Sequence, residues 1–345
     1  MEGYDFSPAD GFEASVDALQ QMIWGGKPHL NKNRGEQQDM NSQFSGINPA
    51  FYACYDESGN VSAERTEALA LHLLKEGVQG LYVGGSSGEC IYLDVDERMK
   101  TIEAVMHAVG GKMKVICHVA CNNTRDSQKL AAHAESLGVD AIAAIPPIYF
   151  HLPDDAIAAY WNDISAAAPK TPFIIYNIPQ LAGVALTLPL LKKMLQNPNV
   201  IGVKNSSMPT QDIQIFKAAG GADFTVFNGP DEQYVGGRIM GADAGIGGTY
   251  AAMPRLFLKA EQLLQKGDFA GAKRVQYQVN DIITALCSGK GNMYAVIKGV
   301  LAARCGVECG GVRKPLMNLT DADKQVVAHC CELINAAYAR EELAQ

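Results

Sequence analysis

The sequence predicts an α/β fold of the (β/α)8 type, a TIM barrel with a C-terminal helical extension, and three observations support that prediction. From residue 47 onward, short β-rich runs alternate with longer helical patterns, and there are eight such runs. Nearly every position in these runs is apolar or small, which is typical of parallel strands covered by helices on both faces. Eight βα units that close on themselves form a TIM barrel.

The expected strands are separated by segments with the start and stop signals of crossover helices. The segments "SAERTEALALHLLKEG" and "TRDSQKLAAHAESLG" begin with Ser or Thr, carry apolar residues at helical spacing and end with Gly. The strands are expected at residues 47–55, 80–85, 114–120, 141–147, 173–179, 200–206, 224–229 and 244–250.

Three segments follow from this arrangement. Residues 1–45 are expected to form an N-terminal arm with room for one short helix in "FEASVDALQQMIW", and Met40 is a candidate native start. Residues 46–255 are expected to form the TIM-barrel catalytic core. Residues 256–345 contain helical patterns without further strands, so they are expected to close the barrel and extend it.

The composition is that of an ordinary globular protein with ample material for a core. Of its 345 residues, 48% are hydrophobic and 19% are charged, with a formal net charge of -8. That charge argues against nucleic acid or an anionic membrane as a partner, because both attract clustered Lys and Arg. No apolar run is as long as a membrane span and no apolar signal core is present, so a cytoplasmic location is expected.

The nine cysteines are scattered, which indicates reduced thiols rather than a disulfide framework. Cys117 and Cys121 are four residues apart, as are Cys305 and Cys309, so a metal pair is conceivable. The usual spacing of zinc ligands is absent and no His is placed to complete a site. We therefore expect no metal site.

Polar residues gather where the expected strands end, which is the rim that holds the active site in TIM-barrel enzymes. The strand ends in question are "GGSSGE" (84–89), "PPIYF" (146–150), "YNIP" (176–179), Lys204 in "IGVKNSS", "NGPDE" (228–232) and "GGTY" (247–250).

Lys204 is the candidate nucleophile, because a lysine at the height of the barrel has little room for a solvated ammonium group. Burial lowers a lysine pKa from about 10.4, where the free amine is only about 10⁻³ of the population at neutral pH. A free amine can attack a ketone and form a Schiff base. The alternative is a lysine that reaches the rim or pairs with an acid such as Asp231, and the pattern alone leaves both open.

Two neighbouring features could serve such a nucleophile. Tyr176 ends the adjacent strand, about 4.8 Å away, so its phenol could shuttle protons near the lysine nitrogen. Ser86 and Ser87 lie in a strand-to-helix turn whose backbone N–H groups could hold a carboxylate. Tyr176 could equally be a core residue, and many Gly/Ser-rich turns bind nothing.

Together the motifs "YVGGSSGE", "YNIP", "GVKNSS", "NGPDE" and "GADAGIGGTY", which occur in this order at strand ends, resemble the dihydrodipicolinate synthase and N-acetylneuraminate lyase superfamily of class I aldolases. The resemblance runs from about residue 45 to the C-terminus. It implies Lys204 as the Schiff-base lysine for pyruvate and Tyr176 as the proton-transfer group. It also implies that the hydroxyls of Ser86 and Ser87 hold the pyruvate carboxylate and relay protons, with Ser86 among the catalytic residues. Tyr149 is implied as the tyrosine that reaches into a neighbouring subunit's site and joins this relay.

Within the superfamily, the chain looks like the lyase branch. Leu181 stands where the synthases carry an arginine for a second carboxylate, and a leucine cannot form that bidentate pair. The resemblance assigns the sugar side of the pocket to Ser206, Gly229, Asp231, Glu232 and Gly248. Three residues depart from the lyase pattern: Gly248 replaces a serine, Pro230 a larger residue and Phe150 a second tyrosine.

The resemblance therefore implies a lyase that cleaves a 2-keto sugar acid to pyruvate and an aldehyde, with N-acetylneuraminate as the expected substrate and N-acetylmannosamine as the aldehyde. It implies no cofactor beyond the covalent imine on Lys204. The family assembly implies a homo-oligomer, a dimer of dimers. The alternatives are a pyruvate-dependent aldolase or synthase-like enzyme for another keto acid, and a noncatalytic pyruvate-binding homologue.

Overall fold

The structure, a computed structural model, describes residues 44–343. Residues 1–43, which include the expected short helix and Met40, lie outside the described residues. Within the described residues, the barrel and its helices form one compact unit. Within the described part of the chain, no helix is long and apolar enough to cross a membrane.

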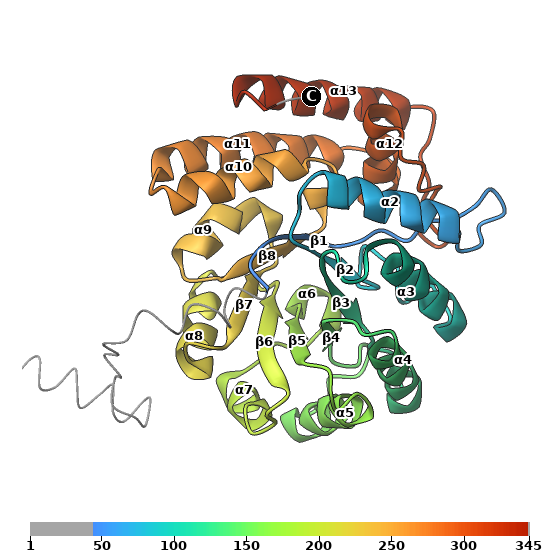
Figure 1. The fold of residues 1–345 in the computed structure, drawn as a ribbon. Coiled ribbons are helices and arrows are strands. Elements are labelled where there is room, and N and C mark those ends of the chain that lie inside the picture. The colour runs from blue at the N-terminus through green and yellow to red at the C-terminus, as the bar shows by residue number, and fades with distance from the viewer. Residues whose placement is uncertain (1–43, 344–345) are drawn as a thin grey trace, which may run out of the picture. The chain divides into compact units, whose positions relative to one another are not determined.

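Eight parallel strands form a single sheet in the order β1-β8-β7-β6-β5-β4-β3-β2, and the sheet curls into a barrel with helices outside it (Figure 1). The seam between β1 and β2 is joined by a bridge between Ala50 and Tyr82, where the Phe51 N–H donates to the Tyr82 carbonyl at 2.9 Å. The predicted TIM barrel is confirmed. The strands are β1 (Gly46–Pro49), β2 (Gly80–Val83), β3 (Lys114–His118), β4 (Ala141–Ala144), β5 (Phe173–Asn177), β6 (Val200–Asn205), β7 (Thr225–Asn228) and β8 (Ala244–Gly247).

The strands are shorter than the sequence predicted, mostly at their C-terminal ends. The first expected strand runs to residue 55, whereas β1 ends at Pro49. The apolar residues that follow, Phe51, Tyr52 and Cys54, are buried in the large core cluster outside the ladder. Apolar runs report burial rather than ladder pairing, so they could not mark where each strand ends.

Helices alternate with the strands around the barrel. Ser62 caps the first crossover helix by accepting from the Arg65 N–H at 3.3 Å, as its sequence predicted. The helix in the segment "TRDSQKLAAHAESLG" is capped by Asn123, one residue before the predicted start at Thr124. The barrel helices are α2 (Ala63–Lys75), α3 (Val95–Val109), α4 (Thr124–Ser136), α5 (Asp154–Ala167), α6 (Pro179–Ala182), α7 (Leu188–Met194), α8 (Gln211–Gly220) and α9 (Tyr234–Ile239), with 3-10 turns η1 (Asp231–Gln233) and η2 (Thr249–Ala251).

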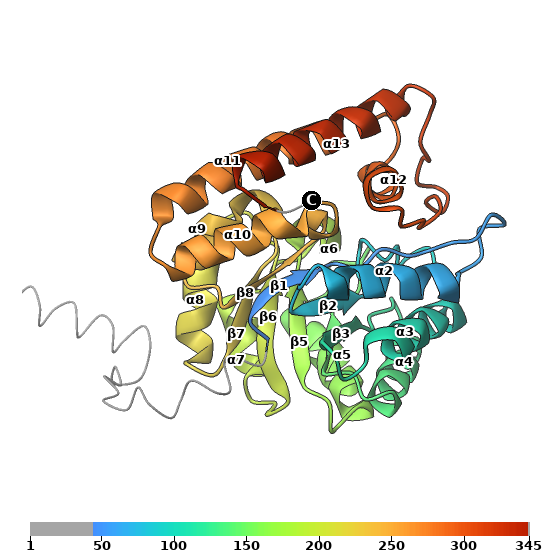
Figure 2. The same cartoon turned by 45° about the horizontal axis from the view of Figure 1, so that its top comes forward.

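Four further helices form the C-terminal region: α10 (Pro254–Gln265), α11 (Phe269–Leu286), α12 (Met293–Cys305) and α13 (Asp323–Arg340). Figure 2 shows α10, α11 and α13 beside one another, and α12 packs mainly against α13. Arg255 of α10 anchors this region to the barrel through both oxygens of Glu76, at 2.7 and 2.8 Å. The helical extension is therefore joined to the barrel by polar as well as apolar contacts.

The apolar core has two parts, as expected for a barrel covered by helices. One large cluster fills the space between the strands and the surrounding helices. A smaller cluster lies inside the barrel and includes Tyr82, Tyr176 and Phe227. The register pairs Lys204 with Tyr176 on β5 and with Phe227 on β7. The lysine is thus held between aromatic neighbours of the inner cluster.

Candidate active site

One cavity of about 320 Å³ at the C-terminal rim contains Lys204. Its walls come from the ends of several strands and from α12. Of the eleven residues that the sequence singled out, ten line this cavity: Ser86, Ser87, Tyr176, Leu181, Lys204, Ser206, Gly229, Asp231, Glu232 and Gly248. The structure brings these residues together, while the chemical role of each remains a prediction.

Lys204 is buried, with 4% of its surface exposed. Its Nζ lies 4.0 Å from the centroid of the Tyr176 ring and 4.1 Å from that of Tyr82. Loss of hydration lowers the pKa of Lys204 to about 7, although the negative charge of Asp231 opposes that change. Near neutral pH a large share of Lys204 is therefore a free amine, which an exposed lysine is not.

Tyr176 is buried, and burial raises its pKa to about 12, while the hydroxyls of Ser86 and Ser206 act in the opposite direction. The phenol is therefore neutral at physiological pH and can donate a proton as well as accept one. Its ring packs edge-on against Tyr82, with centroids 5.6 Å apart, and against His118 at 6.0 Å. These contacts fix the ring beside Lys204.

The turn after β2 presents Ser86 and Ser87 to the cavity. Gly84 begins this turn with φ of 77°, a left-handed conformation that glycine adopts readily. The Gly84 carbonyl accepts a hydrogen bond from Nδ1 of His118 at 2.8 Å. Burial and Arg98 lower the pKa of His118, so its imidazole is neutral. His118 thus anchors the turn that carries the two serines.

Asp231 and Glu232 follow β7 on the opposite side of the cavity. Asp231 is buried, and its Oδ2 accepts hydrogen bonds from the Thr249 N–H and hydroxyl, both at 2.6 Å. Its Oδ1 is buried without a partner among the described residues. Burial raises the pKa of Asp231 to about 7. Glu232 is exposed at the mouth of the cavity. The cavity therefore has one buried carboxyl group, that of Asp231, and one carboxyl group in contact with solvent, that of Glu232.

Glycines at two positions shape this side of the cavity. A Cβ at Gly229 would lie 2.0 Å from Oγ of Ser206, so only glycine fits there. A Cβ at Gly248 would lie 3.4 Å from Oγ of Ser87, which is ordinary contact. Packing therefore does not require a glycine at position 248.

Leu181 lies on the short helix α6, with 60% of its surface exposed at the mouth of the cavity. The described residues place no arginine among the lining residues, so no guanidinium is available there for a second carboxylate. Ile178, Met208 and Met293 make the remainder of this rim apolar.

Tyr149 is the one predicted residue that does not line this cavity. It lines a separate hollow of about 600 Å³ with Phe150, and 85% of its surface is exposed. Its ring packs edge-on against Phe150, with centroids 5.0 Å apart, and its φ is 86°. Tyr149 therefore lies outside the cavity that contains its own Lys204, and its reach into a neighbouring subunit's site stays a prediction.

The sequence did not single out several residues in or beside the cavity that contains Lys204: Met293 and Tyr294 line it, while Tyr52 and Tyr82 lie beside it. Tyr294 and Met293 reach the cavity from the start of α12, and the Tyr52 hydroxyl donates to the Gly248 carbonyl at 2.6 Å. The position of Tyr82 could have been inferred from its place on an expected strand beside the serine turn. Tyr294 has no comparable signal, because it follows the last strand and lies in an ordinary helical pattern.

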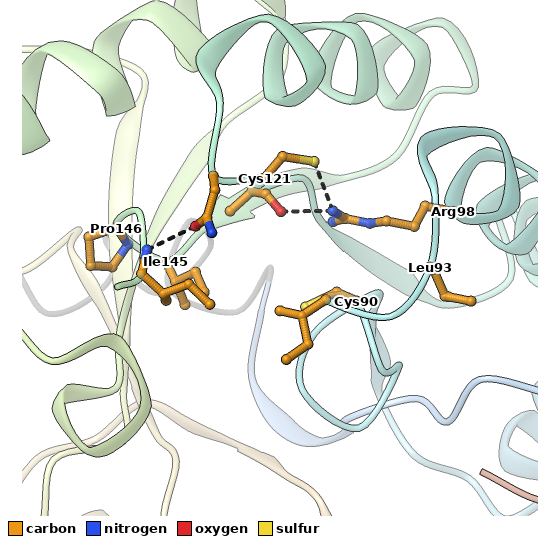
Figure 3. Close-up of a pocket in the computed structure, with 10 residues that line it drawn as sticks. Cys90, Leu93, Arg98, Cys121, Ile145 and Pro146 are labelled. Atoms are coloured by element: carbon orange, nitrogen blue, oxygen red, sulfur yellow. Dashed lines mark hydrogen bonds between the residues drawn. The ribbon is translucent and has the colours of Figure 1, made fainter. Parts of the chain in front are cut away.

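A second cavity, between the ends of β3 and β4 and the turn after β2, contains Cys90 and Cys121 (Figure 3). Arg98 donates to Sγ of Cys121 at 3.3 Å and to the Ala120 carbonyl at 2.7 Å. Burial raises the pKa of both thiols. The guanidinium group of Arg98 therefore lies beside the thiol of Cys121. Within residues 44–343, no three metal-binding side chains are grouped so that they could hold a metal ion.

Comparisons with known proteins place this geometry in a family. The model of the dihydrodipicolinate synthetase family matches residues 43–333. The chain is 59% identical over 292 residues to the N-acetylneuraminate lyase of Mediterraneibacter gnavus, which covers 85% of this chain and 93% of the relative. It is 32% identical over 276 residues to the N-acetylneuraminate lyase of Escherichia coli K12, covering 80% and 92%.

Solved structures agree with the sequence matches. The wild-type sialic acid aldolase of Ruminococcus gnavus superposes with a TM-score of 0.86 at 58% identity, covering 86% of this chain and 99% of that one. The predicted resemblance is confirmed by a family model that spans most of the chain and by relatives of nearly equal length. The chain therefore belongs to the dihydrodipicolinate synthetase family.

Proposed function

We propose that this protein is a class I aldehyde-lyase that cleaves N-acetylneuraminate to pyruvate and N-acetylmannosamine. The observation that carries the proposal is a buried lysine with a pKa of about 7, in a polar cavity of a chain that is 59% identical to an N-acetylneuraminate lyase. Schiff-base chemistry on Lys204 would need no metal or organic cofactor, because the protonated imine itself withdraws electrons.

The reaction begins at the ketone of the open-chain sugar acid. Nζ of Lys204 attacks C2, and the carbinolamine loses its oxygen as water to give a protonated imine. Desolvation makes the free amine about a thousandfold more abundant near pH 7 than in an exposed lysine. The carboxylate of the substrate is held by the turn that carries Ser86 and Ser87, whose hydroxyls and backbone N–H groups can donate to it.

Cleavage of the C3–C4 bond follows. The C4 hydroxyl gives up its proton to the Tyr176 oxygen while the phenol passes its own proton toward Ser86, and the electron pair of the C3–C4 bond moves into the imine to form an enamine. The aldehyde sugar leaves, the enamine takes a proton at C3, and water releases pyruvate and the free amine. A neutral phenol with a pKa of about 12 suits such a relay, because it donates and accepts in one step.

The far side of the cavity suits a neutral polyol. The unpartnered Oδ1 of Asp231, the exposed Glu232 and the Ser206 hydroxyl can bond sugar hydroxyls. Gly248 leaves space for the chain of the substrate, whereas Gly229 allows the backbone to pack closely against Ser206. Leu181, at the apolar rim, removes the cation that a second carboxylate would need, which favours the lyase over a synthase.

We propose further that the enzyme is a homo-oligomer, a dimer of dimers, acting in the cytoplasm. Tyr149 is exposed and adopts a left-handed backbone conformation, which costs about 1–2 kcal/mol for a residue with a side chain. A two-fold contact would bury this tyrosine and deliver its hydroxyl to the partner's cavity twice per dimer.

The experiment for this proposal is a coupled assay of pyruvate release across a panel of 2-keto sugar acids. We expect turnover of N-acetylneuraminate and release of one pyruvate per sugar. Leu181→Arg should weaken this activity about tenfold by adding a cation to the polyol side, while pyruvate still forms an imine with Lys204. Activity only on shorter keto acids would point to another pyruvate-dependent aldolase, and no activity on any of them would overturn the proposal.

A further inference from the structure

A buried ion pair behind the active site joins two parts of the chain that are far apart in sequence. Nζ of Lys298 lies 2.7 Å from Oε1 of Glu89, and the two side chains are 1% and 0% exposed. Lys298 also donates to the Gly311 carbonyl at 2.6 Å. Oε2 of Glu89 accepts from the Tyr55 hydroxyl at 3.1 Å and the Arg313 N–H at 2.7 Å. Both carboxylate oxygens and the ammonium group are therefore hydrogen-bonded.

Glu89 closes the turn that presents the two serines. Its N–H donates to the Ser86 carbonyl at 2.9 Å, so a shift of Glu89 would move the backbone of Ser86. Its φ is 53°, a left-handed backbone conformation that residues with a side chain rarely adopt. The bonds made by its carboxylate hold the chain in this conformation.

Lys298, the other partner of the ion pair, lies on helix α12. Tyr294 precedes it by four residues, one helical turn, and lines the cavity that contains Lys204. Ser87 and Tyr294 both line this cavity. Burial raises the pKa of the Tyr294 phenol, and the Ser87 hydroxyl opposes that rise. Each partner of the ion pair thus lies a few residues from a group that faces the substrate.

Neither Glu89 nor Lys298 lines the cavity that contains Lys204. Glu89 borders an adjoining hollow of about 360 Å³, which shares Ser86 and Tyr294 with that cavity. Because both side chains of the pair are buried, the pair acts on the reaction through the elements that it joins. Buried ion pairs contribute little to stability, because desolvation offsets their attraction, and they favour one geometry over others. A fixed geometry is what the two walls of a substrate pocket require.

We infer that the Glu89–Lys298 ion pair is a positioning device, which fixes the turn carrying Ser86 and Ser87 against the start of α12 and so sets the width of the site that holds the substrate carboxylate. This inference rests on the proposed lyase reaction. The two residues are positioning residues, because neither touches substrate or the reacting atoms.

Three variants test it, with kcat, KM and thermal unfolding measured for each. Glu89→Gln should raise the KM for the keto acid about tenfold or more, with a smaller fall in kcat, because the serine turn loses its fixed position. Borohydride trapping of pyruvate at saturating concentration should persist, since Lys204 and its aromatic neighbours are untouched. A lowered melting temperature with unchanged KM would overturn the inference, because that is the result of a merely structural pair.

The double variant Glu89→Gln/Lys298→Met covers the case in which the single variant does not fold. It leaves no unpaired buried charge, so thermal stability should return toward the wild-type value. KM should nevertheless stay raised, because the hydrogen-bonded ion pair that joins the serine turn to α12 is gone. Recovery of the wild-type KM together with stability would show that the pair does not position the site.

Glu76→Gln is the matched control. Glu76 joins the barrel to the C-terminal helices through Arg255 at 2.7 Å, but it lies on neither the serine turn nor α12. Its loss should lower the melting temperature and leave KM unchanged, and an equal rise in KM would overturn the inference. Wild-type enzyme that neither traps pyruvate nor releases it would instead refute the proposed function.

Discussion

Opposing effects meet at Lys204, and their balance decides what this residue can do. Loss of hydration lowers its pKa, whereas Asp231 raises it and the faces of Tyr82 and Tyr176 stabilise the ammonium form. Loss of hydration has the largest effect, so the pKa falls to about 7. The same burial raises the pKa of Asp231. The site thereby avoids a fixed ion pair, which would leave the lysine protonated and unreactive.

Activity should depend on pH in the direction that this balance sets. The amine form of Lys204 becomes populated as pH rises through about 7, so the free amine should increase from about a tenth at pH 6 to about nine-tenths at pH 8. We expect kcat/KM to rise about tenfold over that interval. Repeating the pH profile with Asp231→Asn measures how much the carboxylate of Asp231 contributes to the pKa of Lys204. A wild-type kcat/KM that does not change between pH 6 and 8 would contradict the assigned pKa of Lys204.

At the scale of elements, the strand ends place the chemistry. Lys204, Tyr176 and the serine turn could be predicted from the sequence because they lie at the C-terminal ends of apolar strands, which share one rim. The residues on the sugar side were assigned by the family resemblance. The helix α6 and the turns η1 and η2 could not, since elements of three or four residues are too short to show a periodic pattern. The contribution of Tyr294 could not be predicted either, because tertiary packing of α12 alone brings it to the cavity.

The close packing of strand β6 against β7 fixes the position of the strand that carries Lys204, and a substitution at Gly202 tests this constraint. A Cβ on Gly202 would lie 2.4 Å from the Thr225 carbonyl oxygen of β7, so alanine there must move the strand that carries Lys204. We expect Gly202→Ala to lower the free energy of unfolding by about 1–3 kcal/mol and to reduce activity. Denaturant unfolding and pyruvate release measure the two effects.

Gly236→Ala is the control for that substitution. Gly236 lies on helix α9, and nothing lies within 4 Å of an added Cβ. Alanine there should stabilise the protein by up to about 1 kcal/mol and leave activity unchanged. Equal behaviour of the two variants would mean that the close contact between β6 and β7 is not a constraint.

At the scale of the whole molecule, one chain encloses Lys204 but leaves Tyr149 exposed outside the cavity that contains this lysine. The barrel could be predicted from the number and alternation of its segments, because each βα unit repeats the same pattern. Assembly could not be derived in this way, since an interface resembles any other exposed surface containing apolar residues. The segment boundaries at residues 45 and 255 also remain predictions, as does the function of the N-terminal arm.

The proposed assembly predicts a separation of catalysis from association. Tyr149→Phe should lower turnover about tenfold or more while leaving the sedimentation coefficient unchanged, because the hydroxyl carries the proton and the ring carries the packing. Tyr277→Phe is the control, since Tyr277 is exposed on α11 and lines no part of the cavity that contains Lys204. A fully active monomer would contradict the predicted crossing of Tyr149 between subunits.

The most direct test of the central claim is the site of imine formation. Treatment with pyruvate and borohydride should add the mass of one reduced pyruvyl group per chain, and peptide mapping should place it on Lys204. Lys204→Met should abolish both the adduct and the lyase activity without unfolding the protein. An adduct on another lysine, or an active enzyme that traps no pyruvate, would contradict the account.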